Sequence, residues 1–265
     1  MNALKRCTLR DVLVVALLGA VAAPYTAAGD PIRPHHTEGA THGVLVLTNT
    51  ADEPLAHGEL IQWEEARGAI ASRLLIRFKD GSLYDESLRF SQRPVLRLLS
   101  YKLAQRGPSF TETSEISFDR SGQYRARVQE VGKEEKTASG SMSIPDDVSN
   151  GMTSLLLKNL RTGASATTHL LAFTPEPQIL ELHLSPEGSD HFVVGSTVER
   201  TTRFLIQPTV PGIKGVVATV IGKQPPSFRM WLTPQPAPAL WKFEGPLYAD
   251  GPTWRITPGS PKWKE

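Results

Sequence analysis

Short runs in which apolar and polar residues alternate follow one another along most of the chain, with turn residues between them. The first run covers 44–48 and the last covers 253–257. The clearest alternation lies on both sides of the turn at 119–122, where Arg125 and Arg127 point away from the apolar face. A period of two residues is typical of strands that bury one face. The pattern therefore predicts an antiparallel all-β domain.

One tight hairpin is expected at Asp80-Gly81, because both central residues of a two-residue turn need positive φ and this dipeptide tolerates it. Such a turn places Phe78 opposite Leu83. The apolar residues further along the second strand would then lie on the opposite face of the sheet, unless the pairing register changes along the strand. We therefore expect a β-bulge at 85–87.

Two segments depart from the strand pattern. Apolar residues fall at helical spacing from Asp146 to Leu160, with acidic residues first and Lys158 and Arg161 near the end, as the helix dipole favours. Residues 212–221 are apolar and bounded by glycine, which fits a helix or a buried strand, and we prefer the helix. One short helix, or two, therefore interrupts the strands.

The fold class follows from these elements. About ten strands with one or two short helices predict a mainly β protein, a single curved antiparallel sheet or barrel with a helix over its opening. A β-sandwich is the alternative. A sheet of this size has to close, curl or cover its edges.

The first 28 residues differ in composition from the rest. Three basic residues precede an unbroken apolar run at 12–23, and small residues follow it. This order is typical of a secretory signal, and the run is shorter than the about 20 apolar residues of a membrane-spanning helix. We expect cleavage after Ala28, with Ala22 as the alternative, and no transmembrane segment after cleavage. The predicted organisation is a signal peptide at 1–28, a flexible leader at 29–41, a single β-rich domain at 42–258 and a C-terminal tail at 259–265.

The expected export and the net charge of the mature chain narrow the classes of function. An exported protein works in the periplasm or, alternatively, outside the cell. The mature chain would carry 26 basic and 26 acidic residues. Without net positive charge it lacks the field that attracts nucleic-acid phosphates, so no nucleic-acid partner is expected. The single cysteine, Cys7, belongs to the signal, so we expect no disulfide.

Residue patterns that could support catalysis are few. Glu181 and His183 share one face of an expected strand and fit a base with its orienting partner, although a polar outer face explains them as well. Lys223 follows glycines at the wrong spacing for a phosphate loop, and no serine-hydrolase or zinc-protease motif occurs. The histidines of 35–42 lack partners at a metal-ligand spacing. We therefore assign no catalytic residue, no metal site and no cofactor.

Three sequence blocks carry a resemblance. They are NGM with LLLKNL at 150–160, GKQPP at 222–226, and EGPLY with GPTWRI at 244–256. The chain resembles an uncharacterised family of exported bacterial β-rich proteins, which implies no activity. More loosely, it is similar to curved-sheet lipoprotein carriers, whose concave face holds acyl chains. Ser149 departs from the family pattern, which is more often aromatic there, and so does the proline-rich 233–238.

These observations favour binding over catalysis. The first hypothesis is a carrier that holds a lipid or another apolar small molecule in a cavity of the curved sheet, covered by the helix at 146–160. The alternative is a structural or interaction protein of the cell envelope with an envelope protein as partner, in which the tryptophan-rich C-terminal region supplies the contacts. A hydrolase is the third hypothesis. The residues expected to line the cavity are Leu99, Tyr101, Phe118, Tyr124, Met152, Leu156, Leu182 and Trp254.

Overall fold

A computed structural model describes residues 31–194, 197–211, 225–234, 236 and 238–259. The first half of this part of the chain is a run of eight strands: β1 (Thr41–Thr48), β2 (Pro54–Glu64), β3 (Ala69–Phe78), β4 (Leu83–Ser91), β5 (Arg97–Arg106), β6 (Glu112–Asp119), β7 (Gln123–Glu130) and β8 (Lys136–Ser141), with a 3-10 turn (Ala66–Gly68) between β2 and β3. The second half contains the helix α1 (Thr153–Lys158) and six strands: β9 (Ala166–Phe173), β10 (Pro177–Val194), β11 (Thr197–Thr209), β12 (Phe228–Leu232), β13 (Leu240–Gly245) and β14 (Trp254–Pro258).

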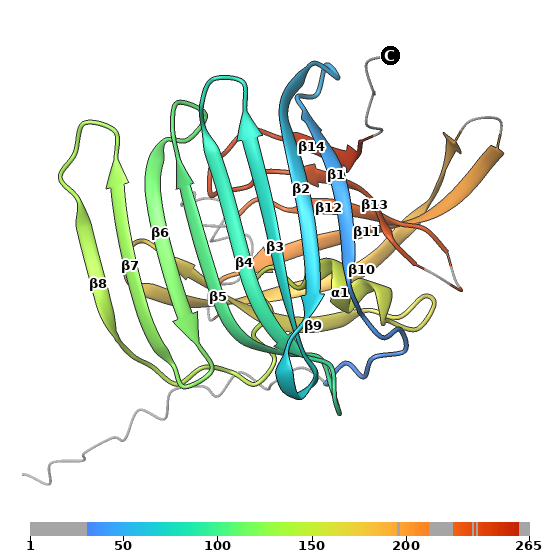
Figure 1. Ribbon diagram of the computed structural model, residues 1–265, viewed down its shortest axis with the longest axis horizontal. Helices are drawn as coiled ribbons and strands as arrows, with labels where there is room; N and C mark the ends of the chain where they lie inside the picture. The colour runs from blue at the N-terminus through green and yellow to red at the C-terminus, as the bar shows by residue number, and fades with distance from the viewer. Residues whose placement is uncertain (1–30, 195–196, 212–224, 235, 237, 260–265) are drawn as a thin grey trace, which may run out of the picture.

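All fourteen of these strands belong to one open antiparallel sheet. Their order is β8-β7-β6-β5-β4-β3-β2-β1-β14-β13-β12-β11-β10-β9, so every neighbour except the β1–β14 pair is the next strand in the chain. The sheet folds over on itself, and β9–β14 lie behind β1–β8 and run across them (Figure 1). The predicted mainly β fold with a single curved sheet is confirmed. The expected number of about ten strands, the closed barrel and the two-sheet sandwich are wrong, because further short strands extend one sheet whose ends do not pair.

Two apolar clusters fill the space between the folded halves. The first surrounds Leu155, Leu156 and Leu157 of α1 and draws on both halves of the sheet. The second lies between β1–β4 and β13–β14 and contains an aromatic group in which the ring of Phe78 lies 5.2 Å from Trp254 and 5.6 Å from Phe110. Helix α1 is therefore part of the core and does not cover an opening.

Helix α1 is also much shorter than expected. It has six residues, and residues 145–152, here called the crossover, have no regular structure. The acidic residues expected at the helix start bind other side chains instead: Asp146 pairs with Arg120 and Asp147 with His169. The second helix expected at 212–221 lies outside the described residues.

The hairpin between β3 and β4 corrects another prediction. Four residues, 79–82, connect the two strands, with Phe78 N–H donating to Ser82 O at 2.9 Å and Gly81 at φ +88°. Arg77, not Phe78, therefore lies opposite Leu83, and the β3–β4 register continues without the expected bulge. The residue that breaks the apolar alternation is Glu86, which points inward.

The crossover covers the free edge of β9. Val148 forms a parallel bridge with His169, and Ser149 N–H donates to His169 O at 2.8 Å. The side-chain amide of Asn150 then acts like a strand backbone, since it accepts from Leu171 N–H and donates to Leu171 O, both at 2.8 Å. The exposed edge of β9 is thus satisfied by a segment that is not itself a strand.

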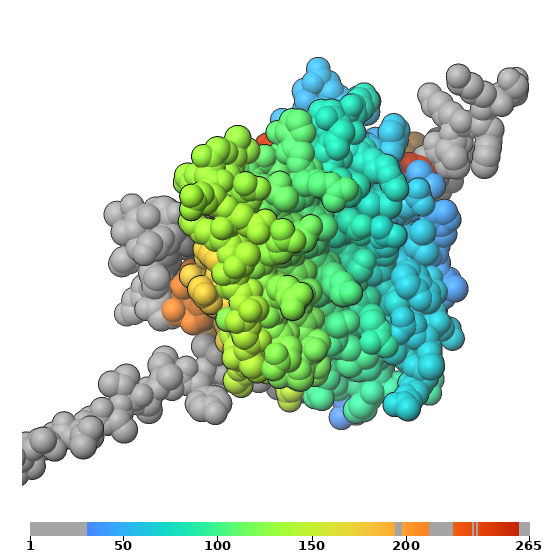
Figure 2. Space-filling view, turned by 60° about the vertical axis from the view of Figure 1, so that its left-hand side comes forward, coloured from blue at the N-terminus to red at the C-terminus, as the bar shows by residue number. Residues whose placement is uncertain are grey.

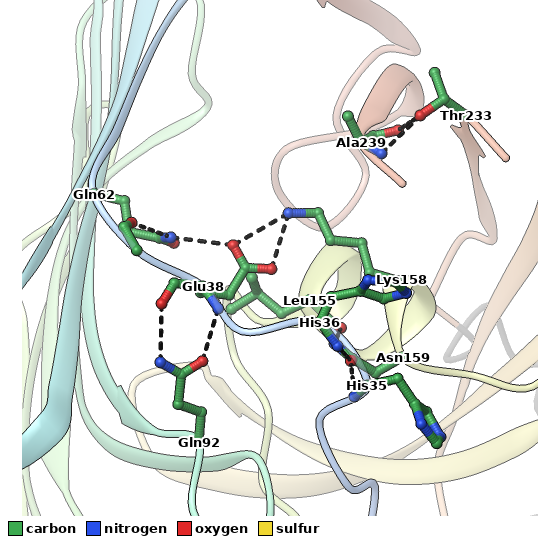
Figure 3. A network of polar contacts seen from close by, with 11 residues as sticks. His35, His36, Glu38, Gln62, Gln92, Leu155, Lys158, Asn159, Thr233 and Ala239 are labelled. Atoms are coloured by element: carbon green, nitrogen blue, oxygen red, sulfur yellow. Dashed lines mark hydrogen bonds and ion pairs between the residues drawn. The ribbon is translucent and has the colours of Figure 1, made fainter. Parts of the chain in front are cut away.

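Residues 31–40, here called the strap, pass beside the C-terminal end of α1, where His35, His36 and Glu38 lie next to Lys158 and Asn159 (Figure 3). The strap has no strand, but polar contacts hold it. Asn159 Oδ1 accepts from the backbone N–H of His35 and His36, and Lys158 Nζ lies 3.0 Å from Glu38 Oε1. Gln92 exchanges two hydrogen bonds with the backbone of Glu38. The sequence predicts a flexible leader in this region and gives no indication of these contacts.

In the part of the chain that the structure describes, no helix has the length and apolar character needed to span a membrane.

Candidate functional site

A row of five inward-facing side chains crosses the middle of β2–β6. Cross-strand pairing places them side by side, and we call them the inner row: Leu60, Leu74, Glu86, Leu103 and Ile116. All five are partly exposed, whereas the inward-facing residues two positions before and after each of them are buried. The inner row is therefore more exposed than the rows on either side of it.

The inner row lies between the two core clusters. Leu103 packs against both clusters, and so do Phe228 and Met230 of β12 from the opposite half of the sheet. These three side chains are also only partly buried. The inner row therefore faces apolar residues of the other half of the sheet.

Glu86 is the one charged residue of the inner row. The hydroxyl of Tyr101 donates to Glu86 Oε1 at 2.7 Å, and the hydroxyl of Tyr84 approaches the same oxygen at 3.3 Å. Burial raises the pKa of Glu86, and the hydrogen bonds from Tyr101 and Tyr84 oppose that rise without cancelling it. Burial beside this carboxyl also raises the pKa of both tyrosines well above the usual range.

The crossover passes next to this carboxyl. Gly151 lies in an exposed turn at φ +71°, and a Cβ there would come within 3.3 Å of Glu86 Cδ and 2.8 Å of Leu88 Cδ2. Only glycine fits both the backbone conformation and this close approach. The crossover therefore forms one wall beside the carboxyl of Glu86.

The residues expected to line a cavity are mostly packed core. Tyr101, Phe118, Met152, Leu156 and Leu182 are buried in the first cluster. Tyr124 packs against this cluster and stays partly exposed.

The other two of those residues lie elsewhere. Trp254 is buried in the second cluster. Leu99 does not share a face with Tyr101, because a bulge opposite Arg89/Phe90 inserts one extra residue into β5. The structure thus brings six of the eight together, but as core and not as the lining of one cavity.

The inner row was not found from the sequence, although one signal was present. From Tyr84 to Phe90 every second residue is large and apolar except Glu86. In the sequence, a single acid at an inward position suggests a shift of register, whereas in the structure Glu86 keeps the register and points inward. The leucines of the row are indistinguishable from core residues by pattern alone.

A separate hollow lies at the end of the core, between the strap and the crossover. Its volume is about 250 Å³, with Ile32, Leu96, Met152 and Leu156 among its apolar lining residues and Asp146 at its polar side. This volume is below the roughly 300–1,000 Å³ of pockets for drug-sized ligands. The hollow therefore suits one small group and not a whole lipid.

Beside this hollow the crossover is fixed by a buried pair. His169 is fully buried, and its Nδ1 lies 2.7 Å from Asp147 Oδ1. In the described residues no hydrogen bond satisfies His169 Nε2. Asp146, in contrast, is well exposed and lies against Arg120 and Arg97. These contacts anchor the crossover to β9 and to the β5–β6 region.

The expected acid–base pair does form on β10. Glu181 Oε2 and His183 Nε2 are 3.6 Å apart, and Thr167 and Thr209 flank the imidazole at 3.2 Å on either side. Neither residue lines any hollow noted here. No three His, Cys, Asp or Glu residues of the described ranges are grouped so that they could hold a metal ion.

The outer face of β4–β7 carries a shallow polar groove of about 360 Å³, on the face seen in Figure 2. Ser87, Lys102, Ser117 and Arg125 are consecutive cross-strand neighbours along it. This groove is open to solvent and is lined mainly by polar and charged residues, with Leu103 and Ile116 of the inner row also among its lining residues.

The fold and these sites define a mainly β protein with one open, folded-over sheet and a partly exposed apolar row that contains one inward-facing carboxyl. Comparison with protein-family models, with curated proteins and with solved structures finds no match to this chain.

Proposed function

We propose that the protein binds an apolar or amphipathic small molecule, such as a lipid chain, along the inner row inside the folded sheet. The observation that carries the proposal is the partial exposure of this row between rows that are buried. Large apolar side chains that stay accessible inside a fold lower their free energy when a ligand covers them. The signal-like first 28 residues support an exported carrier that works in the periplasm or outside the cell.

The dimensions of the row fit an elongated ligand. Adjacent strands are about 4.8 Å apart, so the four spacings from β2 to β6 give a row of roughly 19 Å. The hollow beside the strap takes only a small group. The inner row is therefore the better site for a chain.

A partner-binding role in the envelope is the second candidate. Val44, Ile61 and Trp63 on β1 and β2 are 37 %, 37 % and 42 % exposed, which gives a small apolar patch on the outside of the sheet. The C-terminal tryptophans of the described residues do not support this role, because Trp231 and Trp254 are buried and Trp241 stacks on Phe192, while Trp263 lies outside the described residues.

Titration of the protein with 1-decanol, followed by native mass spectrometry, tests the carrier proposal. Leu103→Trp places a larger side chain in the inner row, and Leu75→Trp makes the same change at a position on the other face of β3. We expect the Leu103 variant to bind decanol at least tenfold more weakly than the wild type, and the Leu75 variant to bind as the wild type does.

Circular dichroism of both variants confirms that each is folded. The carrier proposal fails if the wild type does not bind decanol, or if both variants bind it equally well. Binding of an unrelated protein through Trp63, lost in Trp63→Ala, would support the envelope role instead.

A further inference from the structure

We propose that the inner row is selective for an amphipathic amine, whose ammonium group binds Glu86 Oε2 while its chain lies on the leucines beside it. This inference rests on the proposed function, because the chain of the amine occupies the same row. It goes further in naming the chemical class of the headgroup.

The hydrogen bonds around the carboxyl leave an acceptor for a ligand. Tyr101 and Tyr84 both direct their hydroxyl groups at Oε1. No hydrogen bond to Oε2 is found among the described residues. With both phenol protons used on Oε1, the free oxygen and the phenol lone pairs accept hydrogen bonds, and the phenols have none left to donate. The site is therefore complementary to a donor with several N–H groups.

The carboxyl also lacks a counter-ion. No lysine or arginine of the described residues forms an ion pair with Glu86, although Asp85, the next residue, is paired with Arg73 at 2.6 Å. Buried charges in proteins are normally paired. The raised pKa of Glu86 agrees with this missing cation, since burial dominates and no positive charge opposes it. A bound ammonium would supply the charge that the protein does not.

The groups next to the carboxyl suit the rest of such a ligand. Leu74 and Leu103 are the direct cross-strand neighbours of Glu86. An ammonium at the carboxylate thus leaves an alkyl chain in contact with apolar side chains.

Calorimetric titration with decylammonium, 1-decanol and decanoate tests the inference. These probes share one chain length and differ in headgroup. At pH 8 we expect the wild type to bind decylammonium at least tenfold more tightly than decanol and to bind decanoate most weakly. In Glu86→Gln the preference for the ammonium over decanol should vanish.

Glu59→Gln is the matched control, since Glu59 lies on the other face of β2 and should not alter the preference. The pH gives a second measurement: decylammonium should bind more tightly as the pH rises through the raised pKa of Glu86, whereas decanol binding should stay constant.

The possible failures are distinguishable. If the wild type binds decanol and decylammonium equally, or if Glu86→Gln keeps the preference, the amine inference is wrong and the carrier proposal stands. If decanol does not bind but decylammonium does, and Glu86→Gln abolishes that binding, the carboxyl site is supported and the chain site is not. If none of the probes binds, both proposals are overturned.

Discussion

At the scale of single residues, Glu86 is an inward-facing carboxyl without an ion-pair partner among the described residues. Moving a carboxylate out of water without a cation costs free energy, and two phenol hydrogen bonds recover only part of it. An uncharged residue of similar size would pack there at lower cost. Residues kept at a cost in stability are concentrated at functional sites, which is consistent with a ligand contact at Glu86.

The raised pKa of Glu86 predicts how stability depends on pH. When the pH rises above the ordinary value for Glu, the unfolded chain releases this proton first, so the free energy of unfolding falls until the pH passes the higher folded pKa. Glu86→Gln removes this contribution. We expect Glu86→Gln to become progressively more stable than the wild type across that window, as measured by urea unfolding from pH 4 to pH 8. An unchanged difference over this range would contradict the assignment.

The same residue shows what alternation could and could not predict. The inward faces of Leu88 and Phe90 follow from a period of two, and both are buried. Glu86 lies on that same face, where a polar residue looks like an error of register, and nothing local in the sequence distinguishes a bulge from a buried acid. How far Leu74 and Leu103 are exposed depends on the residues of the opposite half of the sheet that pack against them. A local sequence pattern carries no information about those contacts.

At the scale of elements, the crossover and the strap are two irregular segments that hydrogen bonds and ion pairs fix to the rest of the fold. The sequence predicts a helix from Asp146 because its leucines fall at helical spacing. Only six residues form it, since the preceding ones hydrogen-bond to β9 instead. Tertiary pairing with a free edge outweighed local helix propensity.

Asn150 gives a test of that edge contact. Asn150→Ala leaves Leu171 N–H and Leu171 O without their partners, at a cost of about 2–3 kcal/mol in the free energy of unfolding. Asn150→Asp keeps the acceptor and loses the donor, so its cost should be intermediate. Urea unfolding of the two variants measures both. A loss below about 0.5 kcal/mol for Asn150→Ala would show that water replaces the amide.

The strap gives a second test at this scale. Lys158 and Glu38 have side chains only 19 % and 10 % exposed, so Lys158→Met leaves a largely buried carboxylate without its cation (Figure 3). We expect a loss of about 2 kcal/mol, which is below the value for fully buried pairs. The double variant with Glu38→Gln should lose less than the sum of the single ones. Additive losses would mean that the pair does not couple the strap to α1.

At the scale of the whole molecule, the protein is two meanders joined along β1 and β14. Leu47 lies opposite Ile256 at this junction, and both are buried in the second cluster. The other connection is the crossover between β8 and β9. All further strand pairs join neighbours in the chain.

This arrangement predicts a large effect at the junction. Leu47→Ala should cost about 2–5 kcal/mol in the free energy of unfolding, as expected for a buried leucine. Hydrogen exchange should then accelerate in strands of both halves, because neither half keeps its apolar face covered alone. Val131→Ala, at an 81 % exposed turn position, is the control and should change stability by less than about 0.5 kcal/mol. Faster exchange confined to β1–β8 would indicate that the halves unfold separately.

During synthesis of the chain, β1 is made long before β14, the strand with which it pairs. β1 ends at Thr48 and its partner begins at Trp254. At about 5–20 residues per second, roughly 10–40 s pass before the partner strand exists. Throughout this interval one edge of an apolar strand is open to pairing with another chain. A helper that shields β1 during this interval would therefore raise the yield of folded protein more than one that acts after the chain is complete.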